Sequence, residues 1–192
     1  QQRSSAASDV YKRQTWSCLG EHNVQNAVSA SSAASLIGIE LETISFALAR
    51  FQGVKRRMEI LASCEDYVIY DDFAHHPTEI FKTLSSLREK IGNDQIIAVI
   101  EPRSRTMQSG LHDKEMAKAL STADSVIWYE GQDVKRSMSA ELKKAKAEVY
   151  FAANISEIIQ ITRQIKTTKS NIVIMSNGDF SGLRELIKKE LD

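Results

Sequence analysis

The chain has 192 residues, of which 42% are hydrophobic and 26% charged, which is enough to bury one sizeable core. Lys plus Arg and Asp plus Glu both number 25, so no net charge favours nucleic acid or an anionic membrane as a partner. No stretch approaches the roughly 20 apolar residues of a membrane helix. The two cysteines lack a C-x-x-C or disulfide pattern, as is typical of the reducing cytoplasm.

The N-terminal quarter of the chain has helical patterns only. Residues 1–14 lack apolar periodicity and open without Met, so we interpret them as a non-native or disordered leader. Residues 15–52 carry helical patterns at residues 23–36 and 41–50, with almost no strand signal. We therefore expect residues 15–52 to be the helical end of a larger domain.

Strand and helix patterns alternate over residues 53–192. A strand at residues 58–61 is expected to pair with residues 66–70 around a turn at residues 63–65. This alternation predicts a Rossmann-like, doubly wound α/β domain with a mainly parallel sheet. The remaining strands are expected at residues 96–100, 125–129, 148–151 and 171–175, and the helices at residues 77–91, 111–120, 137–145, 155–167 and 183–191.

Polar side chains gather where three of these strands end, at residues 71–79, 101–106 and 176–182. The carboxyl ends of parallel strands share one edge of a sheet, and ligands of such folds bind there. After the first strand, Pro77 fits the first helical position and Glu79 complements the helix dipole. The three clusters together predict a site for an anionic, amino-acid-like ligand.

The first cluster also has simpler interpretations. Asp71 and Asp72 could do no more than cap the helix that follows them. His75 and His76 are adjacent, so they cannot share one helix face as metal ligands spaced i, i+4 would. Hydrogen bonding to a carboxylate or phosphate is the better functional interpretation of the two imidazoles.

The other two clusters leave alternatives open as well. Arg103 and Arg105 are either ordinary solvated charges or a bidentate fork for a carboxylate or phosphate. Residues 178–182 contain neither G-x-x-x-x-G-K-[ST] nor G-x-G-x-x-G, so this turn is no nucleotide fingerprint. No metal site is predicted.

Residues 71–79, Asp-Asp-Phe-Ala-His-His-Pro-Thr-Glu, resemble the opening of the C-terminal domain in the Mur ligases, the ATP-dependent amino-acid ligases of bacterial cell-wall synthesis. Residues 20–27 are similar to the helix that closes the central ATPase domain of these enzymes, and residues 51–59 to their interdomain hinge. The resemblance implies that residues 15–52 end an ATP-binding domain and that residues 53–192 form the C-terminal domain. It also implies a bacterial, cytoplasmic ligase.

The resemblance implies two sets of binding residues and no assigned catalytic residue. The nucleotide set matches positions near adenine, ribose and phosphates: His22, Asn23, Asn26, Arg57 and Asp72. The substrate set matches positions that face the molecule bringing the amino group: Phe73, His75, Arg103, Ser104, Ser176 and Asn177.

Residues 101–104 and 175–178 are similar, within the family, to ligases whose acceptor is a tripeptide. The implied reaction uses ATP and Mg²⁺ to join L-Ala-γ-D-Glu-meso-diaminopimelate to UDP-N-acetylmuramate through an acyl phosphate, in peptidoglycan recycling. The alternatives are the ligase that adds L-alanine to UDP-N-acetylmuramate, and a non-catalytic peptide-binding module.

The chain departs from the family pattern in two ways. Arg105 stands where the tripeptide type usually has Asn, and Asp179 and Ser181 replace expected glycines. The chain also contains no P-loop and no UDP-sugar domain. We therefore expect it to depend on upstream domains and to be inactive by itself.

Overall fold

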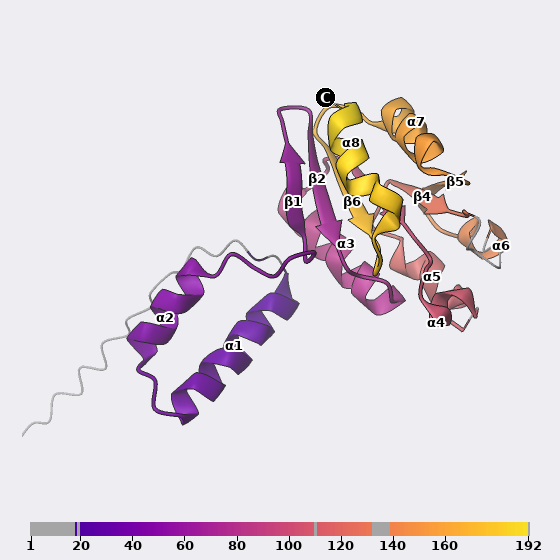
Figure 1. The fold of residues 1–192 in the computed structure, drawn as a ribbon. Helices are drawn as coiled ribbons and strands as arrows, with labels where there is room; N and C mark the ends of the chain where they lie inside the picture. The colour runs from indigo at the N-terminus through magenta and orange to yellow at the C-terminus, as the bar shows by residue number, and fades with distance from the viewer. Residues whose placement is uncertain (1–17, 19, 110, 132–138, 192) are drawn as a thin grey trace, which may run out of the picture.

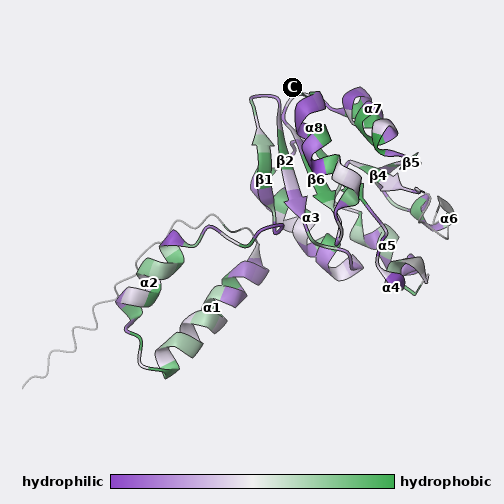
Figure 2. Cartoon of the chain, in the orientation of Figure 1, coloured by the Kyte–Doolittle hydropathy of each residue, from purple (hydrophilic) through white to green (hydrophobic). Residues whose placement is uncertain are grey.

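The computed structural model describes residues 18, 20–109, 111–131 and 139–191, and two helices stand apart from a sheet domain in it (Figure 1). Helix α1 spans Glu21–Leu36 and α2 spans Leu41–Arg50, close to the expected bounds. Of their residues only Ile44 is buried. Hydrophobic side chains such as Val28 and Phe46 are exposed on them. Both helices carry hydrophobic residues, coloured green in Figure 2. The leader expected at residues 1–14 lies outside the described residues.

The described residues form a six-stranded sheet with the order β1-β2-β6-β3-β4-β5. β1 pairs with β2 in an antiparallel hairpin and every other pairing is parallel, which confirms both the hairpin and the mainly parallel sheet. The strands are β1 (Glu59–Ser63), β2 (Tyr67–Asp72), β3 (Ile96–Ile100), β4 (Ser125–Tyr129), β5 (Glu148–Ala152) and β6 (Ser170–Met175).

Helices follow the strands in the expected alternation, with one short addition. Ser104 accepts a hydrogen bond from the Met107 backbone N–H and so begins α4, which is too short to produce an apolar periodicity. The helix expected at residues 137–145 begins inside a segment outside the described residues. The helices are α3 (Pro77–Ile91), α4 (Arg105–Gln108), α5 (Asp113–Ala119), α6 (Ser139–Leu142), α7 (Ile155–Ile165) and α8 (Leu183–Leu191), and a 3₁₀ turn spans Phe180–Gly182.

The sheet has a hydrophobic core on each face because its strands alternate sides. On β3, Ile96 and Ile100 face α3, α5 and α6, whereas Ile97 and Val99 face α7 and α8. Each fully buried side chain of this size contributes about 1.5–3 kcal/mol. Helices cover both faces, as expected of a doubly wound α/β fold.

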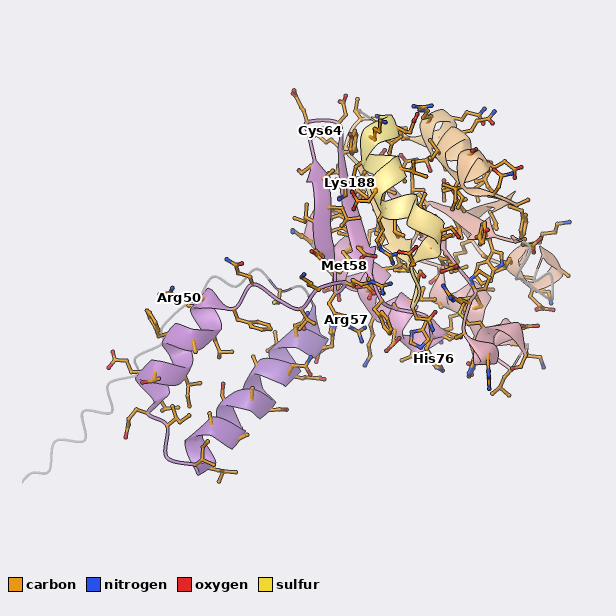
Figure 3. The ribbon with its side chains drawn as sticks, viewed as in Figure 1. Arg50, Arg57, Met58, Cys64, His76 and Lys188 are labelled. Carbon is orange, nitrogen blue, oxygen red and sulfur yellow. The ribbon has the colours of Figure 1, made fainter. Side chains whose placement is uncertain are left out.

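The last strand lies between two earlier ones. β6 pairs with β2 on one side and with β3 on the other, so Met175 lies opposite both Asp72 and Ile100. The carboxyl ends of these three strands therefore meet at one edge. The segment from α2, residues 51–58, enters the domain at the same edge, which Arg57, Met58 and His76 mark, while Cys64 lies at the opposite end of the β1–β2 hairpin (Figure 3). We call residues 51–58 the hinge segment.

Candidate functional site

Asp71 and Asp72 are the last residues of β2, not part of the following turn. Pairing with β6 continues to Asp72, and each aspartate is 2% exposed. The cap of α3 is His76, whose Nδ1 accepts a hydrogen bond of 3.3 Å from the Thr78 backbone N–H. The interpretation that the two aspartates merely cap this helix is therefore wrong, because strand pairing holds them inside the sheet.

The Asp72 carboxylate ties the hinge segment to the strand. Its Oδ2 accepts the Met58 backbone N–H at 2.9 Å, and its Oδ1 accepts the Ala74 backbone N–H at 2.8 Å. The Thr83 hydroxyl lies 3.4 Å from the same Oδ1. Burial raises the pKa of Asp72 above its ordinary value, although these bonds and the positive charge of Arg57 act in the opposite direction.

Asp71 pairs with two arginines from distant parts of the chain. Arg56 Nε lies 3.4 Å from its Oδ2, and Arg184 Nε of α8 lies 2.8 Å from its Oδ1. Neither arginine Nε has hydrogen-bond geometry, so these are ion contacts rather than directed bonds. Two guanidiniums therefore surround one buried carboxylate.

The guanidinium groups of Arg56 and Arg57, in the hinge segment, both lie over the aromatic ring of Phe73. The guanidinium carbons of Arg56 and Arg57 are 5.0 and 5.6 Å from its ring centroid. The His75 ring meets Phe73 edge-on at 5.4 Å, and its Nδ1 lies 3.0 Å from the Phe73 carbonyl oxygen. Since a carbonyl only accepts, His75 Nδ1 carries the hydrogen and neutral His75 keeps Nε2 as an acceptor.

Ser176 forms the centre of a hydrogen-bonded turn at residues 176–178, which we call the Ser176 turn. The Ser176 hydroxyl donates to the carboxylate of Glu101, itself 8% exposed. The Gly178 backbone N–H donates to the same hydroxyl oxygen at 2.9 Å. The end of β3 and the turn after β6 are thus joined through side chains as well as through the sheet.

Arg103 extends over Gly178 of this turn. A Cβ built on Gly178 would lie 2.2 Å from Arg103 Nη1, so only glycine permits this approach. Arg103 is exposed, and its guanidinium has no hydrogen bond or ion pair with the residues described. The Asn177 Oδ1 atom beside it is buried without a partner among those residues. The surface at the Ser176 turn therefore carries the Arg103 cation, while the Asn177 Oδ1 is buried within the turn.

A family model described as "Mur ligase, glutamate ligase domain" matches residues 56–178. The chain belongs to the Mur ligase family. The match begins at the hinge segment and includes all three strand ends, so the predicted family is confirmed on the residues that form the site.

Individual Mur ligases resemble most of this chain. It is 35% identical over 177 residues to the UDP-N-acetylmuramate–L-alanyl-gamma-D-glutamyl-meso-2,6-diaminoheptandioate ligase of Haemophilus influenzae, over 92% of this chain and 39% of that protein. It is 41% identical over 172 residues to the UDP-N-acetylmuramate–L-alanine ligase of Dictyoglomus turgidum, over 83% of this chain and 36% of that protein.

A solved Mur ligase confirms the fold class. The crystal structure of a murein peptide ligase from Psychrobacter arcticus aligns with a TM-score of 0.72 and 35% identity, over 93% of this chain and 38% of that one. The chain therefore spans 36–39% of the length of these three relatives.

The residues expected to bind the nucleotide lie in two separate groups. His22, Asn23 and Asn26 are on α1, where His22 and Asn23 share a side-chain contact of 3.2 Å. Arg57 and Asp72 are at the edge of the sheet domain. α1 meets that domain at Gly20, where a Cβ would lie 2.1 Å from the Ser86 hydroxyl of α3.

The substrate set is brought together more closely, but the hydroxyls of Ser104 and Ser176 have structural roles, and the Ser176 hydroxyl is buried against Glu101. Arg103, Ser176 and Asn177 share the Ser176 turn and its neighbouring loop, and Phe73 reaches the turn through Arg56. Ser104 uses its hydroxyl to cap α4.

Three residues of the site were missed as site residues by the sequence interpretation: Glu101, Arg56 and Arg184. Arg184 carried a signal, because a basic residue in the first turn of a helix opposes the helix dipole and so requires another reason. The contacts of Arg56 and Glu101 depend on the position of β6, which sequence periodicity does not reveal.

Neither a metal-binding cluster nor a membrane-spanning helix is present in the described part of this Mur ligase chain. No group of three or more His, Cys, Asp or Glu side chains in that part of the chain could hold a metal ion. None of its helices is long and apolar enough to cross a membrane.

Proposed function

We propose that residues 53–192 act as the acceptor-binding domain of an ATP-dependent Mur ligase that joins the tripeptide L-Ala-γ-D-Glu-meso-diaminopimelate to UDP-N-acetylmuramate. One observation carries the proposal: the exposed guanidinium of Arg103 lies against the Ser176 turn, at the edge where three parallel strands end. An exposed guanidinium suits the carboxylate of a peptide. The resemblance to the Haemophilus influenzae ligase supports the same acceptor.

The chemistry asked of this domain is binding and orientation. In the proposed reaction a muramyl carboxylate becomes an acyl phosphate at the expense of ATP, the peptide amine attacks its carbonyl carbon, and phosphate leaves. Arg103 is assigned to hold the acceptor carboxylate, and the His75 Nε2 to accept an N–H group of the acceptor peptide. Holding the amine at the carbonyl contributes about 7–11 kcal/mol to such a reaction, so no side chain needs a covalent role.

The nucleotide-binding part of the site is proposed to form where helix α1 meets the sheet domain. Residues 15–52 are assigned to the end of the ATP-binding domain, with His22, Asn23 and Asn26 near adenine and Arg57 near the phosphates. Asp72 acts here through the hinge backbone, because both of its oxygens accept hydrogen bonds within the domain. No group of three or more His, Cys, Asp or Glu side chains among the described residues could hold Mg²⁺, so its ligands are proposed to come from other domains of the ligase.

L-Alanine is the second candidate acceptor. The resemblance to the Dictyoglomus turgidum ligase favours it, since its identity of 41% is no lower than that of the tripeptide relative. The loop at residues 101–104, Glu-Pro-Arg-Ser, favours the tripeptide, because the corresponding loop of the alanine-adding ligases resembles Gln-Pro-His-Arg.

A chimera tests the proposal. Residues 20–192 replace the matching part of the Haemophilus influenzae relative, and ATP hydrolysis is measured with UDP-N-acetylmuramate and either acceptor. We expect turnover with the tripeptide only. The Arg103→Ala variant is expected to raise the KM of the tripeptide about tenfold or more and to change the KM of ATP little.

The control variant is Arg105→Ala, which removes a neighbouring exposed charge. It is expected to change the tripeptide KM far less than Arg103→Ala does. Equal turnover with L-alanine alone would contradict the tripeptide assignment, and an Arg103 effect confined to the KM of ATP would move that residue to the nucleotide side.

A further inference from the structure

We infer that Arg56 and Arg184 are positioning residues that hold the Ser176 turn in the geometry that binds the acceptor carboxylate. The identity of the ligand in this inference rests on the proposed function. The role of the two arginines in ordering the turn does not depend on it. Neither arginine is assigned to touch the substrate. Both act through backbone carbonyls of Ser176, Gly178 and Asp179, which lie against the substrate-binding Arg103.

Arg56 reaches the turn from the hinge segment. Its Nη2 donates to the carbonyl oxygens of Ser176 and Gly178, the second at 2.8 Å, while its Nε faces Asp71. One guanidinium therefore bridges both ends of the turn. A lysine would keep the charge, but its single nitrogen cannot face Asp71 and the two carbonyls at once, as the Arg56 guanidinium does through Nε and Nη2.

Arg184 reaches the same turn from α8, which follows the turn in the sequence. Its Nη1 donates to the carbonyl oxygens of Gly178 at 3.1 Å and Asp179 at 2.6 Å, and its side chain is 14% exposed. Gly178 thus accepts from both arginines. Asp71, between them, balances part of their charge and fixes their orientation.

The position of Arg103 depends on this arrangement. The Gly178 carbonyl is held by Arg56 and Arg184 and its N–H by the Ser176 hydroxyl, and a Cβ built on it would lie 2.2 Å from Arg103 Nη1. A shift of Gly178 would displace the guanidinium proposed to bind the acceptor. The three arginines therefore have two roles: Arg56 and Arg184 order the turn, and Arg103 faces the ligand.

The hinge segment is part of the same arrangement. Arg56 and Met58 have φ angles of 58° and 53°, in the left-handed region that costs non-glycine residues energy. This unusual backbone is held by the Asp72 bond to the Met58 N–H and by the Phe73 N–H, which donates to the Arg56 carbonyl at 2.7 Å. The backbone of residues 56–58 therefore sets where the Arg56 guanidinium meets the turn.

The experiment uses the full 192-residue chain and two readouts. Amide hydrogen exchange followed by NMR reports the order of the turn at the Gly178 N–H, and a titration gives the Kd of the tripeptide. The variants are Arg56→Lys and Arg184→Lys, which keep a charge beside Asp71 and so preserve the fold, together with Arg56→Met as the stronger change.

The matched control is Arg88→Met. Arg88 also donates to backbone carbonyls, those of Gly92 and Asp94 at 2.8 and 2.7 Å, and pairs with Asp124, but at the opposite edge of the sheet. The Arg88→Met variant therefore removes an arginine that bridges backbone carbonyls, but it leaves the Ser176 turn unchanged.

We expect each Arg56 and Arg184 variant to speed exchange at Gly178 and to weaken tripeptide binding by about tenfold, the equivalent of one lost hydrogen bond. The Ile97 amide in β3 should be unaffected, and Arg88→Met should change neither readout at the turn. Exchange and Kd within twofold of the unaltered chain would overturn the inference. Faster exchange with an unchanged Kd would overturn it too, because the arginines would then serve stability alone.

The two proposals fail in different ways. An unaltered chain that does not bind the tripeptide would contradict the acceptor assignment. In that case the exchange rate at Gly178 decides by itself whether Arg56 and Arg184 order the turn.

Discussion

At the residue scale, the adjacent residues Asp71 and Asp72 have different roles because different groups surround them. Asp71 faces Arg56 and Arg184 and acts as a counter-charge. Asp72 faces backbone N–H groups and acts as an acceptor that closes the hinge segment onto β2. Both are buried, so a change at either is expected to be felt in stability.

We predict that Asp72→Asn changes the pH dependence of stability. Burial raises the pKa of Asp72 above its ordinary value of 3.8, so the folded chain binds this proton where the unfolded chain has lost it. As pH falls through the raised pKa toward 3.8, protonation of Asp72 stabilises the folded chain, and below 3.8 the gain is complete. Above the raised pKa, the ionised carboxylate lowers stability by a constant amount.

Urea denaturation from pH 3 to pH 8 measures the effect. The stability of the unaltered chain relative to Asp72→Asn should rise as pH falls across that window and stay level above it. A difference that is independent of pH throughout would contradict the raised pKa.

Ser181 offers a second prediction at this scale, because it lies at φ 50° and ψ 37° within a run of left-handed residues. Glycine adopts this conformation without the steric penalty, so Ser181→Gly is expected to stabilise the chain by about 1 kcal/mol. The measurement is the free energy of unfolding in urea.

Gly182 is the matched control for Ser181. Its φ is 74°, with open space where a Cβ would project. Gly182→Ala should destabilise the chain by about 1 kcal/mol through backbone strain alone. Destabilisation by Ser181→Gly would show that the serine side chain has a role that outweighs its strain.

At the scale of elements, the start of α3 joins the site to the core. Pro77 occupies the first helical position and His76 caps the helix through Nδ1, while Leu84 and Leu87 bury the helix against the sheet. The His76 ring also meets that of His112, at the start of α5, at 4.4 Å. The turn that carries Phe73 and His75 is thus anchored at its far end.

His76→Ala is predicted to cost about 1 kcal/mol of stability, the usual value of an N-cap. His76→Asn should recover most of it, because asparagine is a strong capping residue. Chemical denaturation of both variants provides the measurement. Equal loss in both would mean that the contact with His112, rather than the cap, is what His76 contributes.

The elements were largely predictable from local patterns, whereas their order was not. The strand at residues 96–100 and the helix at residues 183–191 have the bounds that their apolar spacing predicts. The insertion of β6 between β2 and β3 depends on pairing across a hundred residues, which no local pattern encodes. For that reason Asp71 and Asp72 were predicted on a turn although they belong to a strand.

The site residues follow the same division. Arg103, Ser176 and His75 lie beside recognisable strand ends, so motif and position predicted them together. Arg56, Arg184 and Glu101 act through partners that only the folded chain brings near.

At the scale of the whole molecule, one edge of the sheet collects the hinge segment, the Ser176 turn and the loop of Arg103. The helices α1 and α2 lie beyond this edge (Figure 1). They expose apolar side chains such as Val24 and Phe46. A domain arranged in this way presents its binding groups toward the part of the chain that precedes it. This agrees with the role of acceptor-binding domain.

The central claim is that this edge binds the tripeptide. Titration of the 192-residue chain with L-Ala-γ-D-Glu-meso-diaminopimelate, and separately with L-alanine, followed by amide chemical shifts, tests it most directly. We predict saturable shifts at Ser176, Asn177 and Gly178 with the tripeptide and none with L-alanine, and loss of the response in Arg103→Ala. Shifts confined to another surface, such as the groove between α7 and α8 beside Arg163, or an equal response to L-alanine, would contradict the claim.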